Sequence, residues 1–158
     1  ESGMHAVKLE GGKRVVDKIS AIVNSGILVQ GHIGLTPQTA NALGGYKVQG
    51  RTVDGAIALY EDALALQSAG CFSIVLECVP EKVAMEITNA LDIPTIGIGA
   101  SKYCDGQILV FDDLIGLNPM NYKFVKKYAS IRNEISKAVS NYSKEVRKIK
   151  FPNKKNSF

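Results

Sequence analysis

The stretch "FSIVLECVPEKVAMEITNAL", residues 72–91, contains one complete strand-to-helix unit. Its first half is a short apolar run of the kind found in buried strands, and this run ends in an acid, Glu77. Pro80 stands where a helix accepts proline most readily, and apolar residues then recur at helical spacing as far as Leu91. An apolar strand that leads directly into a helix is the repeating unit of α/β proteins with a parallel sheet.

The same alternation extends over most of the chain. Glycine and proline separate short apolar runs from amphipathic segments, which indicates where the elements begin and end. Strands are expected at residues 5–10, 27–34, 72–77, 93–100 and 106–111, and helices at residues 13–24, 36–43, 52–69, 80–91, 112–117 and 121–148. Thr36, directly before Pro37, is the predicted N-cap of the second helix. Strands joined through helices predict the α/β class with a parallel sheet.

The composition is that of one soluble globular domain, with 158 residues of which 46% are hydrophobic and 22% charged. No apolar run approaches the roughly 20 residues of a membrane span. The first residues lack both an initiating Met and the basic and apolar regions of a signal peptide, so the chain starts as if cut from a longer protein. The three cysteines lack paired CxxC spacing, so we expect reduced thiols and a cytoplasmic location.

The charge is distributed unevenly along the chain. Residues 1–120 hold 8 Lys/Arg against 13 Asp/Glu, whereas residues 121–158 hold 11 against 2. Such a basic end is consistent with a solvated helix, and also with a surface that attracts anions. No signature of a DNA- or RNA-binding module accompanies it, so nucleic acid is not an expected partner.

Polar side chains stand at the ends of several predicted strands. Side chains alternate across a strand, so Lys8 and Glu10 share one face, Gln30 and His32 lie together on the next strand, and Glu77 ends a later one. The active sites of parallel α/β proteins lie at the carboxyl ends of the strands. The sequence therefore predicts that these polar groups converge at one edge of the sheet.

Each of these residues also has a purely structural interpretation. An isolated acid such as Glu77 can cap the following helix, Lys8 can pair with Glu10, and His32 alone is typical of a hydrogen-bonded core histidine. Several acids together at a strand end more often meet a cation or a substrate, because an unpaired buried carboxylate is costly. Mg²⁺ prefers oxygen ligands and often takes only one or two carboxylates plus substrate. Zn²⁺ is not indicated, since His32 lacks companions at ligand spacing.

The glycine-rich stretch "GIGASKYCDGQ", residues 97–107, does not match the nucleotide-binding loops. Lys102 occupies the last glycine position of the Rossmann pattern, and no GK[ST] ending of a P-loop is present. A tight loop at a strand end is the expected structure.

Seven motifs follow one another along the chain: "HAVKLEGG", "GHIGLTPQ", "LGGYKVQGRT", "ALQSAGCFSIVLECVP", "IPTIGIGA", "CDGQILV" and "DLIGL". Together they resemble one enzyme family, the ketopantoate hydroxymethyltransferases. The resemblance extends from about residue 3 to residue 135. It implies a (β/α)₈ TIM-type barrel, of which this chain resembles strands four to eight with their helices. Residues 1–120 are then the C-terminal part of the barrel, and residues 121–158 are the C-terminal helix and basic tail of the same domain.

The resemblance also implies an activity. Members of the family transfer a hydroxymethyl group from 5,10-methylenetetrahydrofolate to 3-methyl-2-oxobutanoate, which gives 2-dehydropantoate for pantothenate biosynthesis. They use Mg²⁺, which chelates the 2-oxo acid and favours its enolate. The family forms homodecamers, so the basic tail is expected either in subunit contacts or in attracting the polyglutamate of folate.

Carried over by motif, four residues of this chain have expected roles. Glu10 belongs to the shell of the metal, through water, and Lys8 lies beside the substrate oxygens. His32 lines the site. Glu77 is the expected general base, which takes the proton from C3 of the oxo acid or handles protons at the incoming one-carbon unit.

Two departures from the family pattern qualify this carry-over. The early strands of the barrel, which in the family supply two metal-binding aspartates and a serine beside the oxo acid, have no counterpart here, so this chain by itself is expected to have an incomplete Mg²⁺ site. Ser101 stands where the family usually has glycine, and its side chain would crowd the loop if the position needs a positive φ. Two alternatives stay open: another Mg²⁺-dependent barrel enzyme acting on a 2-oxo acid enolate, and a truncated chain without catalysis.

Overall fold

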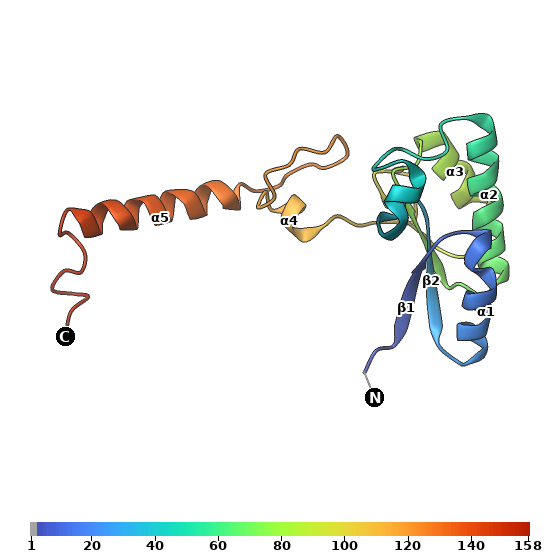
Figure 1. Cartoon of the computed structure of the whole chain (residues 1–158), viewed down its shortest axis with the longest axis horizontal. Helices are drawn as coiled ribbons and strands as arrows, with labels where there is room; N and C mark the ends of the chain where they lie inside the picture. The colour runs from blue at the N-terminus through green and yellow to red at the C-terminus, as the bar shows by residue number, and fades with distance from the viewer. Residues whose placement is uncertain (1–2) are drawn as a thin grey trace. The chain divides into compact units, whose positions relative to one another are not determined.

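The computed structural model describes residues 3–158, apart from the side chain of Leu43. The chain forms two compact units, Glu1–Ile108 and Leu109–Phe158. The first unit contains a single five-stranded sheet (Figure 1). Its strands are β1 (Ala6–Glu10), β2 (Leu28–Gly34), β3 (Ser73–Glu77), β4 (Thr95–Ile98) and β5 (Gly106–Gln107). Every neighbouring pair is parallel. The predicted α/β class with a parallel sheet is confirmed.

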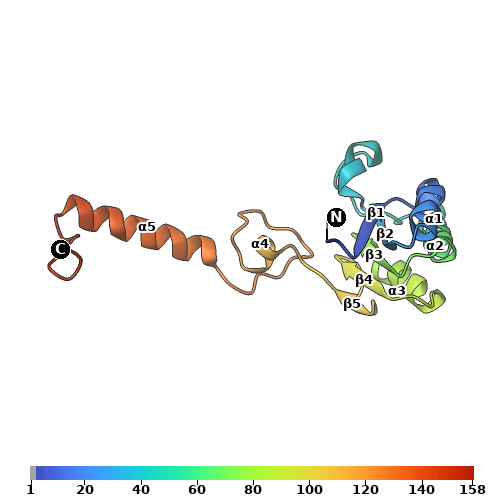
Figure 2. The same cartoon turned by 90° about the horizontal axis from the view of Figure 1, so that it is seen from below.

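The order of the strands distinguishes a barrel from an open doubly wound sheet. The five strands lie side by side in the order in which they occur in the chain, and Figure 2 shows the α-helices of this unit on one side of them. A doubly wound sheet reverses its order at a switch point and carries helices on both faces. Sequential parallel strands with an outer layer of helices are instead the arrangement of a (β/α)₈ barrel, of which this unit forms an arc.

Three α-helices form the outer layer, and two short 3₁₀ helices lie in the connections after β1 and β2. The α-helices are α1 (Val16–Asn24), α2 (Val53–Ser68) and α3 (Glu81–Ala90), and the 3₁₀ helices are η1 (Lys13–Val15) and η2 (Pro37–Leu43). The predicted helices at 13–24, 52–69 and 80–91 are therefore confirmed to within a few residues. Thr52 caps α2 by accepting a hydrogen bond from the Gly55 N–H at 3.1 Å, as an N-cap threonine is expected to do.

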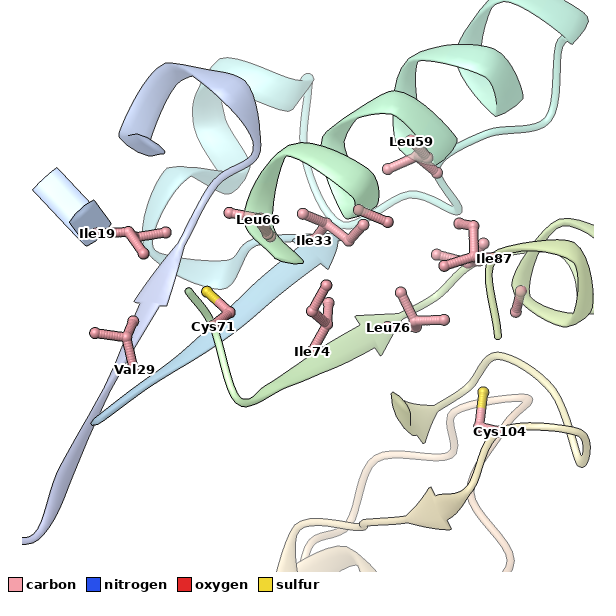
Figure 3. Packing of buried hydrophobic residues seen from close by; sticks show 13 residues of the cluster. Ile19, Val29, Ile33, Leu59, Leu66, Cys71, Ile74, Leu76, Ile87 and Cys104 are labelled. Atoms are coloured by element: carbon pink, nitrogen blue, oxygen red, sulfur yellow. The ribbon is translucent and has the colours of Figure 1, made fainter. Parts of the chain in front are cut away.

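The hydrophobic core lies between the sheet and these helices. One face of β2 and β3 presents Val29, Ile33, Ile74 and Leu76, which are all buried. The helices contribute the other half of the core, through Ile19, Leu59, Leu66 and Ile87 (Figure 3). Because side chains alternate across a strand, the opposite face of the sheet is left to the polar residues at the strand ends.

Two predicted elements differ from the structure. The helix predicted for 121–148 is α5 (Ile131–Arg147), and residues 121–130 are not helical. Their backbone instead pairs with the region of α4 (Phe111–Leu114), where the Tyr128 N–H donates to the Leu114 carbonyl at 2.8 Å. The strand predicted for 106–111 is reduced to β5, because only its first two residues pair with β4.

The helix α5 differs from the α-helices of the first unit because none of its residues is buried. Its apolar side chains recur on one stripe and are exposed, namely Ile131, Ile135, Val139, Tyr142 and Val146. Among residues 3–158, no helix combines the length and the apolar character that crossing a bilayer requires.

Gly34, at the end of β2, provides a test of the strand-end geometry. Its φ is +89°, and a Cβ there would overlap the Glu77 carbonyl oxygen and lie 2.7 Å from Val79 Cγ2. We expect Gly34→Ala to lower the free energy of unfolding by about 2 kcal/mol or more, from the left-handed backbone and the overlap together. The matched control is Gly26→Ala, because Gly26 also has a positive φ but open space around it. Urea unfolding that shows equal losses for both variants would contradict this account.

The thiol of Cys71 provides a test of the buried core. Burial raises the pKa of this thiol to about 11, from 9.0, against an opposing contribution from a hydrogen bond with the Gly31 backbone. Because the folded pKa is the higher one, the stabilisation is complete below pH 9 and is lost as the pH rises toward 11. Iodoacetamide reacts with the thiolate, so at pH 8.5 we expect Cys71 to react at least about 100-fold more slowly in the folded protein than in urea, because the raised pKa lowers the thiolate fraction and burial also shields the sulfur.

Mass spectrometry of the Cys71 peptide measures this rate. The rate in the folded protein should keep rising tenfold per pH unit until about pH 11. A rate that levels off near pH 9 would show that the thiol has its ordinary pKa.

Candidate active site

The pairing register places the four predicted site residues on one face of the sheet. Glu10 is paired with His32, Lys8 with Gln30, and Glu77 with Gly34. Residues paired in a parallel sheet point to the same face, and this face is the one opposite the helices. The predicted convergence of strand-end polar groups from β1, β2 and β3 is therefore what the structure has.

His32 lies at the centre of these residues, and its side chain is 2% exposed. Its Nδ1 is 3.3 Å from Lys8 Nζ and 3.6 Å from Glu10 Oε1. Its Nε2 is 3.1 Å from Glu77 Oε2. One imidazole thus separates two carboxylates from different strands, and both carboxylates are largely buried.

The contacts of Nδ1 decide the tautomer of His32. A lysine ammonium can only donate, so Nδ1 accepts a hydrogen bond from Lys8. The longer distance to Glu10, 3.6 Å, is outside the hydrogen-bond range, and it does not require a proton on Nδ1. In the neutral imidazole the proton is then on Nε2, which faces Glu77.

The Nε2–H group has no well-aligned acceptor. Glu77 Oε2 is near enough for an ion pair, yet among the described residues Nε2 makes no hydrogen bond. A distance of 3.1 Å without a hydrogen bond means that the carboxylate oxygen lies away from the direction of the N–H group. A hydrogen bond weakens steeply as its angle departs from linear. A buried donor without a partner is costly, so this N–H is available to a reoriented Glu77 or to a ligand oxygen.

The chain on both sides of Glu77 is fixed by backbone bonds. The Glu77 carbonyl accepts from the Leu35 N–H at 2.8 Å, and the Cys78 N–H donates to the Ile98 carbonyl at 2.9 Å. Cys78 itself has a φ of +50°, which is uncommon for a residue with a side chain. Its carbonyl accepts from the Gln49 N–H at 2.9 Å. The loop between β2 and α2 is thus attached at both ends to the residues around Glu77.

This loop also reaches Glu10, which the sequence analysis did not anticipate. The Gln38 N–H donates to Glu10 Oε2 at 3.0 Å. In the sequence, Gln38 follows directly on "GHIGLTP". Its position just after a predicted strand is the one feature of the sequence that indicates a residue near the site. A backbone donor carries no side-chain pattern, and only the path of the loop reveals it.

Gln30 and Ser101 have local hydrogen-bond partners. The Gln30 amide donates to Ser73 Oγ at 2.8 Å. Gln30 lies two residues before His32 on the same face of β2. Of the described residues other than glycine, only Cys78 and Ile149 have a positive φ. Ser101 therefore needs no left-handed backbone, and its hydroxyl accepts from the Tyr103 N–H at 3.1 Å. The expected crowding at Ser101 does not occur.

The residues present match only part of an Mg²⁺ site. Glu10 offers carboxylate oxygens of the kind that Mg²⁺ prefers, with one of them already bound to the Gln38 N–H. Within residues 3–158, no three His, Cys, Asp or Glu side chains are grouped so that they could hold a metal ion. A metal at this edge would need further oxygen ligands from elsewhere.

Comparison with known proteins gives one consistent result. The family model described as ketopantoate hydroxymethyltransferase matches residues 1–154. Curated proteins named 3-methyl-2-oxobutanoate hydroxymethyltransferase are similar over the whole chain, with 57% identity in Clostridium beijerinckii, 56% in Heliobacterium modesticaldum and 52% in Nitratidesulfovibrio vulgaris. The chain covers 58%, 58% and 52% of these proteins, so it spans little more than half of their length.

The central place of His32 can be tested by stability. His32→Phe keeps a ring of similar size but leaves Lys8 without its acceptor and the two carboxylates without the imidazole between them. We expect a loss of about 1–3 kcal/mol in the free energy of unfolding. The control Gln30→Leu removes one neutral hydrogen bond on the same strand and face, at about 1 kcal/mol or less. Urea unfolding in which Gln30→Leu costs the same or more would argue against a central His32.

Proposed function

This chain belongs to the ketopantoate hydroxymethyltransferase family, and from this premise we propose that a full-length protein containing it transfers a hydroxymethyl group from 5,10-methylenetetrahydrofolate to 3-methyl-2-oxobutanoate. The reaction consumes one water molecule, and the products are 2-dehydropantoate and tetrahydrofolate. The observation that carries the proposal is the convergence of Lys8, Glu10, His32 and Glu77 from three neighbouring strands at one edge of the sheet.

The rest of the relatives' length supplies what this chain lacks. A (β/α)₈ barrel has eight strands, and the sheet here has five. We infer that three strands N-terminal to β1 complete the barrel and cover the exposed edge of the sheet. In the same way, the oxygen ligands that complete the Mg²⁺ site come from the ends of these strands, since the described residues offer one suitable carboxylate, Glu10.

Lys8 is the residue that binds the negative charge of the oxo acid. Its ammonium group is bonded to His32 Nδ1 at 3.3 Å, so it is held at the inner face of the sheet edge. An ammonium can give up one neutral acceptor for a carboxylate or keto oxygen of the substrate, because charge-assisted hydrogen bonds are about twice as strong as neutral ones. Lys8 then orients the 2-oxo acid and stabilises the charge of its enolate.

Glu10 orients the metal, through water. When bound, Mg²⁺ supplies Lewis-acid polarisation of the 2-oxo acid and so makes its C3 proton more acidic. Glu10 is suited to its part because both of its oxygens have fixed surroundings, the Gln38 N–H on one side and the His32 ring on the other.

Glu77 is the proposed general base. Its carboxylate is largely but not completely buried, which leaves it accessible to a substrate at the edge of the sheet. It accepts the C3 proton of the oxo acid, and C3 then forms a bond with the one-carbon unit. Water supplies the hydroxyl oxygen of the transferred group as the bond between this carbon and the folate nitrogen breaks, and the same carboxylate can pass a proton to the departing nitrogen. The Nε2–H of His32, which has no aligned acceptor, donates to Glu77 once the carboxylate turns toward it.

Partners and location complete the proposal. The two organic substrates are small molecules, and neither nucleic acid nor a membrane is a proposed partner. The protein works in the cytoplasm as a homo-oligomer, with ten subunits as in the family. The exposed apolar stripe of α5 and the basic end of the chain support a role of the second unit in subunit contacts.

The first experiment is an Mg²⁺-dependent assay of 2-dehydropantoate formation by the full-length protein, whose intact mass is determined beforehand. Glu77→Gln keeps the size of the side chain and removes the base, so we expect kcat to fall by about 10²- to 10⁴-fold. The matched control is Glu81→Gln, because Glu81 is an exposed carboxylate four residues further along the chain, at the start of α3.

Two results would count against the proposal. One is a wild-type protein of the length of its relatives that forms no 2-dehydropantoate with Mg²⁺ and methylenetetrahydrofolate. The other is a Glu77→Gln variant that keeps the activity of Glu81→Gln, which would remove Glu77 from the role of base.

A further inference from the structure

The end of β1 and the connection after it make two hydrogen bonds to the loop after β2. Glu10 ends β1 and accepts a hydrogen bond from the Gln38 N–H at 3.0 Å. Arg14, four residues further on, donates from Nη2 to Thr39 Oγ1 at 3.1 Å. Glu10, at the end of β1, and Arg14, in the connection after it, therefore bind two adjacent residues of the loop after β2. Both of these residues lie within Thr36–Thr39, which we call the 36–39 turn.

The two threonines of this turn are bonded to each other. Thr36 occupies the N-cap position of η2, yet its side chain makes no capping bond. Its hydroxyl instead lies 2.6 Å from the hydroxyl of Thr39. Either hydroxyl can be the donor of this bond, because the Thr39 hydroxyl can instead donate to the Thr36 carbonyl oxygen, at 3.4 Å. The expected N-cap threonine thus serves a side-chain network.

The backbone of the turn is adapted to this network. Thr39 departs from helical geometry, with φ −120° and ψ 18°, inside a segment that is otherwise 3₁₀ helix. The Thr39 N–H still donates to the Thr36 carbonyl at 2.9 Å, so the turn is closed on itself. Thr36 is buried, whereas Gln38 is exposed. The bond from the exposed Gln38 N–H to Glu10 therefore depends on the closed turn beside it.

We propose that Arg14 and Thr39 are positioning residues for Glu10: they hold the 36–39 turn so that the Gln38 N–H fixes one oxygen of the Glu10 carboxylate and leaves the other directed toward His32. This proposal rests on the proposed function only for the statement that Glu10 serves catalysis. Neighbours that orient a metal-associated group typically change affinity or activity by about 10- to 100-fold when they are removed.

The first test measures the bond itself and needs no activity. In the full-length protein, Thr39→Val removes the hydroxyl and keeps the shape of the side chain. We expect the Gln38 amide hydrogen to exchange with solvent about 10-fold faster, because a closed hydrogen bond is what protects it. Thr39→Ser, which keeps the hydroxyl, should exchange like the wild type.

A double-mutant cycle then shows whether Thr39 acts through Glu10. Glu10→Ala removes the acceptor and should accelerate Gln38 exchange as much as Thr39→Val does. The double variant should be no faster than either single variant, since both remove the same bond. Additive accelerations would mean that Thr39 merely stabilises the loop, and the proposal would be wrong.

The second test uses turnover. For Thr39→Val and for Arg14→Met we expect the Mg²⁺ concentration at half-maximal rate to rise about 10- to 100-fold, with Thr39→Ser close to the wild type. The matched control is Thr88→Val, because Thr88 also shares a hydroxyl pair, with Thr95 at 2.8 Å, but between α3 and β4. It should lower stability without changing the Mg²⁺ requirement. Arg14 is exposed, so Arg14→Met gives a readable result even if Thr39→Val folds poorly.

The outcomes separate the two claims. If the wild type forms no 2-dehydropantoate, the proposed function fails, and Gln38 exchange in Thr39→Val, in Arg14→Met and in their combinations with Glu10→Ala still decides whether the two residues hold Glu10. If the wild type is active but Thr39→Val leaves Gln38 exchange unchanged, the positioning role is refuted. An accelerated exchange with an unchanged Mg²⁺ requirement also refutes it, because the turn would then be held without consequence for Glu10.

Discussion

The pairing register of β1, β2 and β3 is the constraint on which the rest of the structure depends. It sets Glu10 beside His32 and Gly34 beside Glu77, so that residues from three strands meet at one height of the sheet. A slip of one residue would turn the whole polar set toward the helices. The buried apolar residues on the other face, such as Ile33 and Leu76, oppose such a slip because it would expose them.

Within this register, the buried imidazole of His32 lies between the polar groups and is within 3.6 Å of each of them. Nδ1 of His32 lies 3.3 Å from Lys8 Nζ on one side, and Nε2 lies 3.1 Å from a Glu77 oxygen on the other, so one imidazole separates a cation from a carboxylate. Groups of this kind are costly to bury without partners. The Gln38 N–H provides such a partner for the Glu10 carboxylate, and backbone bonds from the loop after β2 fix the chain at Glu77 and Cys78.

The elements that could be predicted are those whose side chains repeat with a clear period. The strand at 72–77 and the helix at 80–91 agree closely with β3 and α3, because apolar period and proline placement act locally. The helix predicted from 121 was wrong for its first ten residues. Their amphipathic pattern suits a helix, but their backbone pairs with α4 instead, and a long-range backbone bond leaves no trace in the local sequence.

The sequence by itself determined the α/β class, the polar ends of the strands and the resemblance to one enzyme family, because periodicity and motif order are properties of neighbouring residues. Only the tertiary structure decided which atoms meet. Lys8 is 24 positions from His32, and Glu10 is 28 positions from Gln38. Such contacts depend on the strand register and on the path of a loop, and these are set by the packing of the sheet against its helices.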